Sequence, residues 1–234
     1  MCINAELLTT LTAFGLEKSP VAVGFFQSPP PGLSRVAQPD AAGCGYWKLA
    51  SEGHSFYTTA DDHLNCSVGA FTHGVDLSPE SSQELQSLLG TMIELQYLSG
   101  DEISSIPHRT TPMQVAAYAP LAKATFPPDV VIVRGNVRQI MLLSEAARAA
   151  GVFETGAIMG RPACAMLPAA IASSTSVASV GCIGNRVYTG LGDDELYLTV
   201  PGDRAGVVFE KLESIFNANR ELEKFHRQRA KTLG

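Results

Sequence analysis

The sequence predicts an α/β or α+β domain in which a mixed sheet is flanked by helices. Short apolar runs rich in β-branched residues alternate along the chain with amphipathic segments that begin at capping residues. Hydrophobic residues make up 45% of the 234 residues and charged residues only 17%, so the chain can bury a substantial core. The length suits one domain or two small ones, and we expect a single domain over residues 1–234.

Strands are predicted where β-branched residues cluster between turn signals. The clearest, SPVAVGFF at 19–26, precedes a loop rich in proline and glycine at 27–45. Three similar runs are HSFYTTA at 54–60, DVVIVRG at 129–135 and ELYLTVPG at 195–202. The segment 111–121, TPMQVAAYAPL, is apolar but fits either a helix or a strand.

Helices are predicted from capping signals and apolar periodicity. The clearest follows Ser78, a suitable N-cap, with Pro79 at its first position. Its apolar stripe consists of Leu85, Leu88, Leu89 and Met92. Further helices are expected at 4–14, after an N-cap at Asn136, at 161–173 with a break at Pro168, and after an N-cap at Asp203.

The two halves of the chain, 16–100 and 125–215, resemble each other. In each half a cysteine stands eight positions before a glycine: Cys66 before Gly74, and Cys182 before Gly190. One interpretation is an old duplication that relates the halves by a pseudo-two-fold axis. The other is chance similarity between small-residue loops, because so short a match is weak support for a repeat.

Composition and charge narrow the function classes. The formal net charge of −6, from 17 basic and 23 acidic residues, argues against a nucleic-acid-binding protein, which needs a basic face. No apolar run is long enough to span a membrane, and the N-terminus lacks the basic region of a signal peptide. We therefore expect a cytoplasmic protein whose five cysteines stay reduced and form no disulfide framework.

Four cysteines share a context of small neighbours: Cys44, Cys66, Cys164 and Cys182. Glycine and alanine let the backbone approach a bulky inorganic cluster and direct N–H groups at its sulfurs. Four thiolates match the ligand number of a [4Fe–4S] cluster, a [2Fe–2S] cluster or a structural zinc ion. The alternative is that these residues are small hydrophobes filling tight turns, since no C-x-x-C pair is present.

The cysteines lie in four blocks of distinctive sequence: GCGYW, NCSVGAFTHG, GRPACAM and GCIGNRVYTGLGDDELYLTVPG. In this combination the chain resembles the uncharacterised domain-of-unknown-function family 169, also called ArCR-type proteins, over residues 5–225. That family is common in anaerobic bacteria and archaea and has no firmly assigned reaction. The resemblance implies that all four cysteines are signature residues, and it favours a cluster or metal site.

Two arginines near these cysteines are candidate substrate-binding residues. Arg161 precedes a proline at an expected helix start, and Arg186 lies on a glycine-flanked segment after Cys182. A guanidinium in such a place can grip a carboxylate or phosphate, which predicts a small anionic ligand. For Arg186 the alternative is an ion pair within the acidic segment 193–195.

Histidines and aromatic residues flank the same blocks. His73 is a candidate catalytic proton donor near a reactive cysteine, and His63 is a weaker one, although a surface or capping role is the common alternative. Three aromatic residues could wall a ligand pocket or simply pack in the core: Tyr46, Trp47 and Tyr188. The acidic segment at 193–195 fits a solvated turn better than a hard-cation site.

These residues support three hypotheses of different class. The first is a [4Fe–4S] protein, such as an oxidoreductase or lyase, acting on a small anionic molecule or exchanging electrons with a partner. The second is a metal-free thiol enzyme in which Cys66 is the nucleophile beside His73. The third is a non-catalytic small-molecule-binding domain with zinc or nothing at the cysteines. All three exclude nucleic acid and membrane as partners and leave room for a homodimer.

Overall fold

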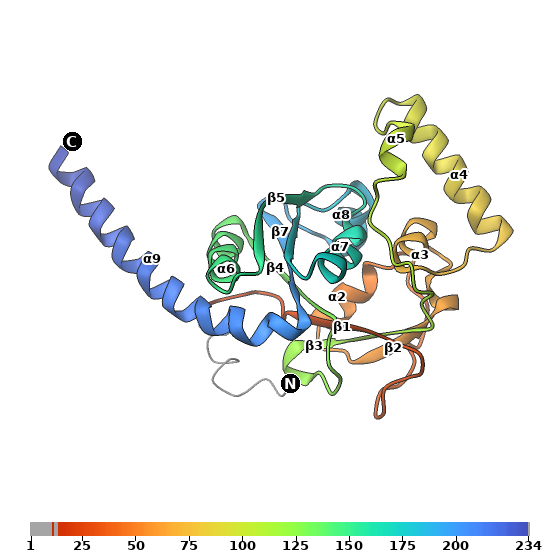
Figure 1. The fold of residues 1–234 in the computed structure, drawn as a ribbon, viewed down its shortest axis with the longest axis horizontal. Coiled ribbons are helices and arrows are strands. Elements are labelled where there is room, and N and C mark those ends of the chain that lie inside the picture. The colour runs from red at the N-terminus through yellow and green to blue at the C-terminus, as the bar shows by residue number, and fades with distance from the viewer. Residues whose placement is uncertain (1–10, 12–13, 234) are drawn as a thin grey trace.

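The computed structural model describes Leu11 and residues 14–233, which fold around one seven-stranded sheet with helices on both faces (Figure 1). The strands are β1 (Val21–Phe26), β2 (Phe56–Thr59), β3 (Val115–Pro120), β4 (Val130–Asn136), β5 (Phe153–Met159), β6 (Ser176–Ser179) and β7 (Glu195–Pro201). They lie in the order β2-β3-β1-β4-β7-β6-β5. Neighbouring strands are antiparallel except β5 and β6, which are parallel. The sheet is therefore mixed, and the predicted fold class is confirmed.

The helices connect and cover the strands. They are α2 (Gly45–Ser51), α3 (Ser67–His73), α4 (Pro79–Glu94), α5 (Gly100–Ile103), α6 (Val137–Ala149), α7 (Met166–Ser173), α8 (Ile183–Thr189) and α9 (Ala205–Leu233). Short 3-10 turns are η1 (Ala60–His63), η2 (Leu121–Lys123), η3 (Ala163–Ala165) and η4 (Gly202–Arg204). No helix in the described part of the chain is both long and apolar enough to cross a membrane.

Alternation of side chains along the strands divides the interior into two cores. In β4, Val131 and Val133 face the core beneath α6 and α9, whereas Val130 and Ile132 face the core beneath α2, α3 and α7. Such two-sided burial explains why this strand reads as a continuous apolar run. Burial of each Val or Ile side chain stabilises the folded state by about 1.5–3 kcal/mol.

Two predicted helix starts are confirmed by their caps. The Ser78 hydroxyl accepts a hydrogen bond from Ser81 N at 3.1 Å, and Pro79 occupies the first position of α4. The Asn136 side chain accepts one from Gln139 N at 2.9 Å and starts α6. These caps satisfy N–H groups that have no partner within the helix.

Other local predictions need correction. Pro168 does not break its helix, because it lies in the first turn of α7, where its missing N–H is not needed. Asp203 lies within η4, and α9 begins at Ala205. The helix predicted at 4–14 falls outside the described residues apart from Leu11 and Phe14.

The strand registers of the two halves of the sheet correspond. Val21 of β1 lies opposite Pro120 of β3, and Val130 of β4 lies opposite Pro201 of β7. Between them, β1 and β4 pair about a centre where Ala22 lies opposite Val131. The division at 16–100 and 125–215 stays a prediction, and β3 lies outside the first of these two ranges.

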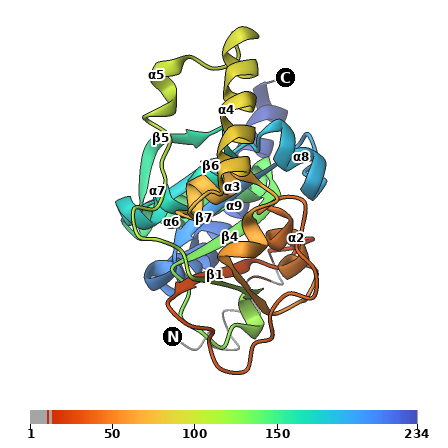
Figure 2. The ribbon, with the colours of Figure 1, turned by 90° about the vertical axis from the view of Figure 1, so that its right-hand side faces the viewer.

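Two helical segments stand away from the body at opposite ends of the molecule (Figures 1 and 2). One consists of α4 and α5, and the other is the C-terminal part of α9. The rest of α9 packs on α6 and the sheet through three fully buried residues, Val208, Phe209 and Leu212. The body between the two projections holds both cores.

Candidate four-cysteine site

Each of the four cysteines lies at or just before the start of a different helix. Cys44, Cys66 and Cys182 are the N-cap residues of α2, α3 and α8. Cys164 lies in η3, which leads directly into α7. The helices that carry the cysteines come from both halves of the chain, so only the folded sheet can bring the thiols together.

The spacing between cysteine and glycine has a simple structural meaning. Helix α3 begins after Cys66 and ends at Gly74, which has φ of 72°, and α8 begins after Cys182 and ends at Gly190, which has φ of 62°. Only glycine adopts this left-handed conformation without strain. The predicted loops are therefore short helices, each with a cysteine at one end and a glycine cap at the other.

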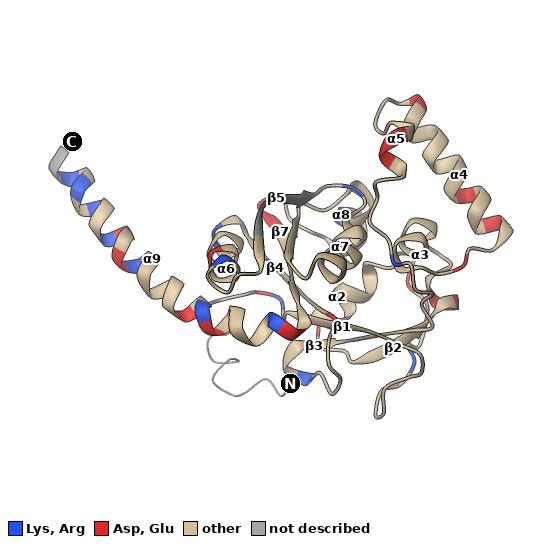
Figure 3. Ribbon diagram, in the orientation of Figure 1, with Lys and Arg blue, Asp and Glu red and all other residues tan. Residues whose placement is uncertain are grey.

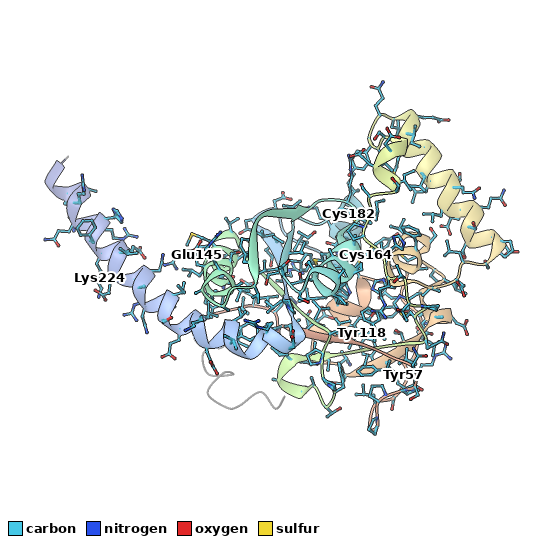
Figure 4. The ribbon with its side chains drawn as sticks, viewed as in Figure 1. Tyr57, Tyr118, Glu145, Cys164, Cys182 and Lys224 are labelled. Atoms are coloured by element: carbon cyan, nitrogen blue, oxygen red, sulfur yellow. The ribbon has the colours of Figure 1, made fainter. Side chains whose placement is uncertain are left out.

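The four thiols gather on the sheet face covered by α2, α3 and α7. Burial, together with the nearby thiols of Cys66 and Cys182, raises the pKa of Cys44 to about 12. Burial likewise raises the pKa of Cys164, and the other three cysteines add to that effect. Figure 4 shows Cys164 and Cys182 near α7 and α8. The structure thus brings all four predicted ligands into one electrostatically coupled group.

Glycines permit close packing around Cys66. A Cβ atom on Gly69 would lie 3.0 Å from the Cys66 Sγ atom and 3.8 Å from the Cα atom of Gly43. The Gly69 amide also donates a hydrogen bond to that Sγ atom at 3.4 Å. The small residues around the cysteines are needed for this close approach of backbone to sulfur.

Several buried polar atoms beside the thiols have no hydrogen-bond partner. They include the Tyr118 hydroxyl, both polar atoms of the Asn185 amide, and His63 Nδ1. The Asn185 side chain lies close enough to Cys44 to lower the pKa of that thiol, and Tyr118 lies close enough to Cys44 to interact with it electrostatically. A Cβ atom on Gly43, next to Cys44, would lie 3.4 Å from His63 Nδ1. Unpaired polar groups are rare in protein interiors, and those beside Cys44 could pair with a bound group.

His63 and His73 form a buried pair with their ring centroids 5.4 Å apart. His73 Nδ1 lies 2.7 Å from the Gly69 carbonyl oxygen, and His63 Nε2 lies 2.9 Å from the Thr58 hydroxyl. Burial lowers the pKa of His63 to about 3 and that of His73 to about 4. Both rings are therefore neutral at pH 7, and His73 lies at the end of α3 opposite Cys66.

The predicted anion-binding arginines lie at the edge of the site and are already paired. Arg161 donates hydrogen bonds to the Tyr97 carbonyl and to Glu102, and its guanidinium lies over the Tyr97 ring. Arg186 donates to two backbone carbonyls and forms an ion pair with Asp193 at 3.4 Å. The ion pair that the sequence left as an alternative for Arg186 is thus present.

The flanking aromatic residues differ in position. Tyr46 and Trp47 are buried in the core beneath α2, and the Tyr46 hydroxyl donates a hydrogen bond to the Asp62 carbonyl at 2.5 Å. Tyr188 is exposed. Tyr46 and Trp47 therefore have the core role given as the alternative, and they belong to the same buried cluster as Cys44 and Cys164.

Sequence reasoning missed Asn185 and Tyr118. Asn185 lies three positions after Cys182, which places it on the same side of α8 as that cysteine. Tyr118 lies in β3, the segment whose pattern fitted either a helix or a strand. Strand periodicity would have placed Tyr118 on the same face as Ala116, the face that carries the cysteine group.

The chemistry of the donor set suits an inorganic cluster. Thiolates are the usual ligands of iron–sulfur clusters, and the surrounding N–H, amide and hydroxyl groups can donate to cluster sulfurs. Among residues 11 and 14–233, no group of three or more His, Cys, Asp or Glu side chains is gathered closely enough to hold one metal ion.

Comparison with known proteins identifies the family. The model of domain-of-unknown-function family 169, described as "Uncharacterised ArCR", matches residues 11–211, so the chain belongs to this family. An uncharacterized protein of Methanocaldococcus jannaschii is 26% identical over 168 residues, which cover 69% of this chain and 71% of that protein. No solved structure matches the chain.

Proposed function

We propose that the protein binds an iron–sulfur cluster, most simply [4Fe–4S], through Cys44, Cys66, Cys164 and Cys182. The observation that carries this proposal is the convergence of four thiols, each from the start of a different helix, on one buried face of the sheet. Four inert cysteines scattered over 139 positions have no reason to meet in this way.

Metal binding would change the protonation of the buried thiols. Burial raises the pKa of Cys44 and Cys164 far above neutral pH, so without metal these thiols hold their protons. Metal ligation removes such protons, and it offsets the mutual repulsion of the thiolates. The unpaired Tyr118 hydroxyl and Asn185 amide would then donate to sulfur.

The exposure of the cysteines gives the site an inner and an outer side. Cys44 and Cys164 are buried, whereas Cys66 and Cys182 are half-buried. A cluster held by all four would transfer electrons or stabilise the fold, and one held by three would offer an open iron to a small anion. An electron partner or substrate would approach from the side of Cys66 and Cys182. An anion that binds Arg186 would have to displace Asp193 from its ion pair with that arginine.

The metal-free thiol enzyme has less support from the geometry. Cys66 Sγ accepts a hydrogen bond from Gly69, and no hydrogen bond joins it to His73 among the described residues. A general base must come within hydrogen-bond reach of the thiol, which would require these two ends of α3 to rearrange.

The test is iron and acid-labile sulfide content, with a visible absorption spectrum, on protein purified without oxygen. We expect brown protein with about equal iron and sulfide. Single changes Cys44→Ser, Cys66→Ser, Cys164→Ser and Cys182→Ser should each lower cluster content at least severalfold. Cys2→Ser is the matched control, because Cys2 lacks the small-residue context of the other four, and its cluster content should equal that of the parent protein.

Two results would overturn the proposal. One is colourless, metal-free protein after anaerobic reconstitution with iron and sulfide. The other is one equivalent of zinc and no sulfide, which would indicate a structural ion. A colourless protein whose activity is lost only in Cys66→Ser would support the thiol enzyme instead.

A further inference from the structure

Helix α4 has an apolar stripe that the body of the protein covers only in part, since Leu85, Leu89 and Met92 are half-buried and Leu88 is exposed. Ser81 is the one buried residue of α4, all of which the structure describes. None of the residues in the stripe belongs to either core. Four large apolar residues of this region are exposed: Leu88, Ile93, Leu95 and Tyr97. An amphipathic helix normally buries its whole apolar face, so the exposed part of this face lacks a partner among the described residues.

The segment that carries α4 and α5, residues 77–107, is also acidic throughout. It contains five acidic residues, Glu80, Glu84, Glu94, Asp101 and Glu102, and no Lys, Arg or His. Within the described chain, only Glu102 of this acidic arm forms an ion pair, with Arg161. The arm therefore presents negative charge together with exposed apolar side chains.

The opposite projection has the complementary character. Residues 220–233, the C-terminal extension of α9, contain five Lys or Arg residues and two Glu residues. The two acidic residues form local pairs, Glu221 with Lys224 and Glu223 with Arg227, which leaves a net positive charge. Leu222 and Phe225 are more than half exposed on this extension. Figure 3 shows the acidic arm and the basic extension at opposite ends, and Figure 4 labels Lys224 on the latter.

We propose that two copies of this chain associate antiparallel, with the basic extension of α9 in each copy docked along the acidic arm of the other. Charge selects this pairing: arm against arm or extension against extension would bring like charges together. In a dimer with a two-fold axis, the arm of each copy meets the extension of the other, so both contacts form at once and the assembly closes. The apolar residues of the two surfaces, Leu95 and Phe225 among them, then cover each other.

Charge reversal tests the pairing directly. The arm variant carries Glu84→Lys, Glu94→Lys and Asp101→Lys, and the extension variant carries Arg220→Glu, Lys224→Glu and Lys231→Glu; all six residues are exposed. Sedimentation velocity of the full chain should show a dimer at low salt. At high salt the association constant of the dimer should fall about tenfold or more. Each variant alone should be monomeric, and an equimolar mixture of the two should form a heterodimer, because each variant then meets opposite charge.

A control separates this effect from a general change in charge. Glu145→Lys, Glu210→Lys and Glu213→Lys make the same charge change at exposed positions of α6 and the packed part of α9, and they should leave the dimer intact. Circular dichroism checks that every variant is folded. A monomeric parent protein, a dimer that survives both reversals, or a mixture that stays monomeric would overturn the proposal. So would monomeric protein that binds vesicles of anionic lipid through the extension.

Discussion

At the scale of single residues, Asp62 shows how one carboxylate organises the loop before α3. Its two oxygens accept two hydrogen bonds from Arg35 at 2.9 Å, and one of them also accepts from the Thr59 amide at 2.7 Å. Burial alone would raise the pKa of Asp62, but Arg35 and Thr59 hold it below its ordinary value. The contribution of this ion pair to stability is therefore complete above about pH 4 and is lost as pH falls through the lowered pKa.

Replacing Asp62 by asparagine should destabilise the protein. Asp62→Asn removes the charge that pairs with Arg35 while keeping the shape, and we expect the free energy of unfolding to fall by about 1–3 kcal/mol at pH 7. Thermal or urea unfolding measures the loss. Asp61→Asn is the matched control, because Asp61 is exposed, and it should change stability by less than about 0.5 kcal/mol. Equal effects of the two changes would show that the Asp62 network contributes nothing.

The residue scale also shows what the sequence could and could not reveal about the site. The cysteines stood out because their small neighbours form a local pattern. The partners of Arg161 could not be recognised from the sequence, since Tyr97 and Glu102 lie 64 and 59 positions away from it. Asn185 and Tyr118 were missed because polar atoms facing a buried group have no signature until the strand and helix that carry them are placed. Local chemistry is readable from the sequence, whereas the pairing of distant side chains depends on the fold.

At the scale of elements, the long amphipathic segments were predicted well and the short helices were not. Helices α4 and α6 can be predicted from their capping residues and their periodic apolar residues. Helices α3 and α8 have seven residues each, too few for a periodic stripe to be recognised. They are held instead by an N-cap, a left-handed glycine and contacts from the rest of the fold.

The junction after β7 gives a test at this scale. A Cβ atom on Gly202 would lie 1.8 Å from the Pro128 carbonyl oxygen, a backbone atom that cannot move without displacing β4. The matching position after β3 is Leu121, so the turn itself does not require glycine; the requirement comes from Pro128. We expect Gly202→Ala to lower the free energy of unfolding by about 3 kcal/mol or more.

Gly90→Ala is the control for that substitution. Gly90 lies within α4 with nothing within 4 Å of its added Cβ atom, and alanine favours helix by up to about 1 kcal/mol. Urea unfolding at high salt should find this variant as stable as the parent protein or slightly more stable. A Gly202→Ala protein of unchanged stability would mean that β4 and η4 can separate at little cost.

At the scale of the whole molecule, the fold class followed from the sequence but the arrangement of the strands did not. Alternating strands and helices are local properties, and they predict a mixed sheet with helices on its faces. The order of the strands depends on pairings such as Val130 with Pro201, which join positions far apart in the chain. Strands β5 and β6 were missed altogether, since neither is a long β-branched run. The convergence of the four cysteines follows from this arrangement, and so no spacing rule could have predicted it.

The buried pair His63 and His73 should make the whole molecule sensitive to acid. Burial lowers the pKa of both in the folded state, to about 3 and about 4, whereas an unfolded histidine titrates near about 6.5. Between these values the unfolded chain binds protons that the folded chain does not. The free energy of unfolding should therefore fall as pH decreases from about 6.5 to about 4, by about 1 kcal/mol per pH unit for each histidine.

Urea unfolding at a series of pH values measures this slope. His73→Gln keeps a donor for the Gly69 carbonyl oxygen but cannot titrate, so we expect it to lose about half of the histidine contribution to the slope. His54→Gln is the control, because His54 is exposed, and its slope should match the parent protein. If His73→Gln and the parent protein had the same slope, the pair would not be buried and neutral in solution. The close packing of η1 and α3 beside the cysteine group would then be wrong as well.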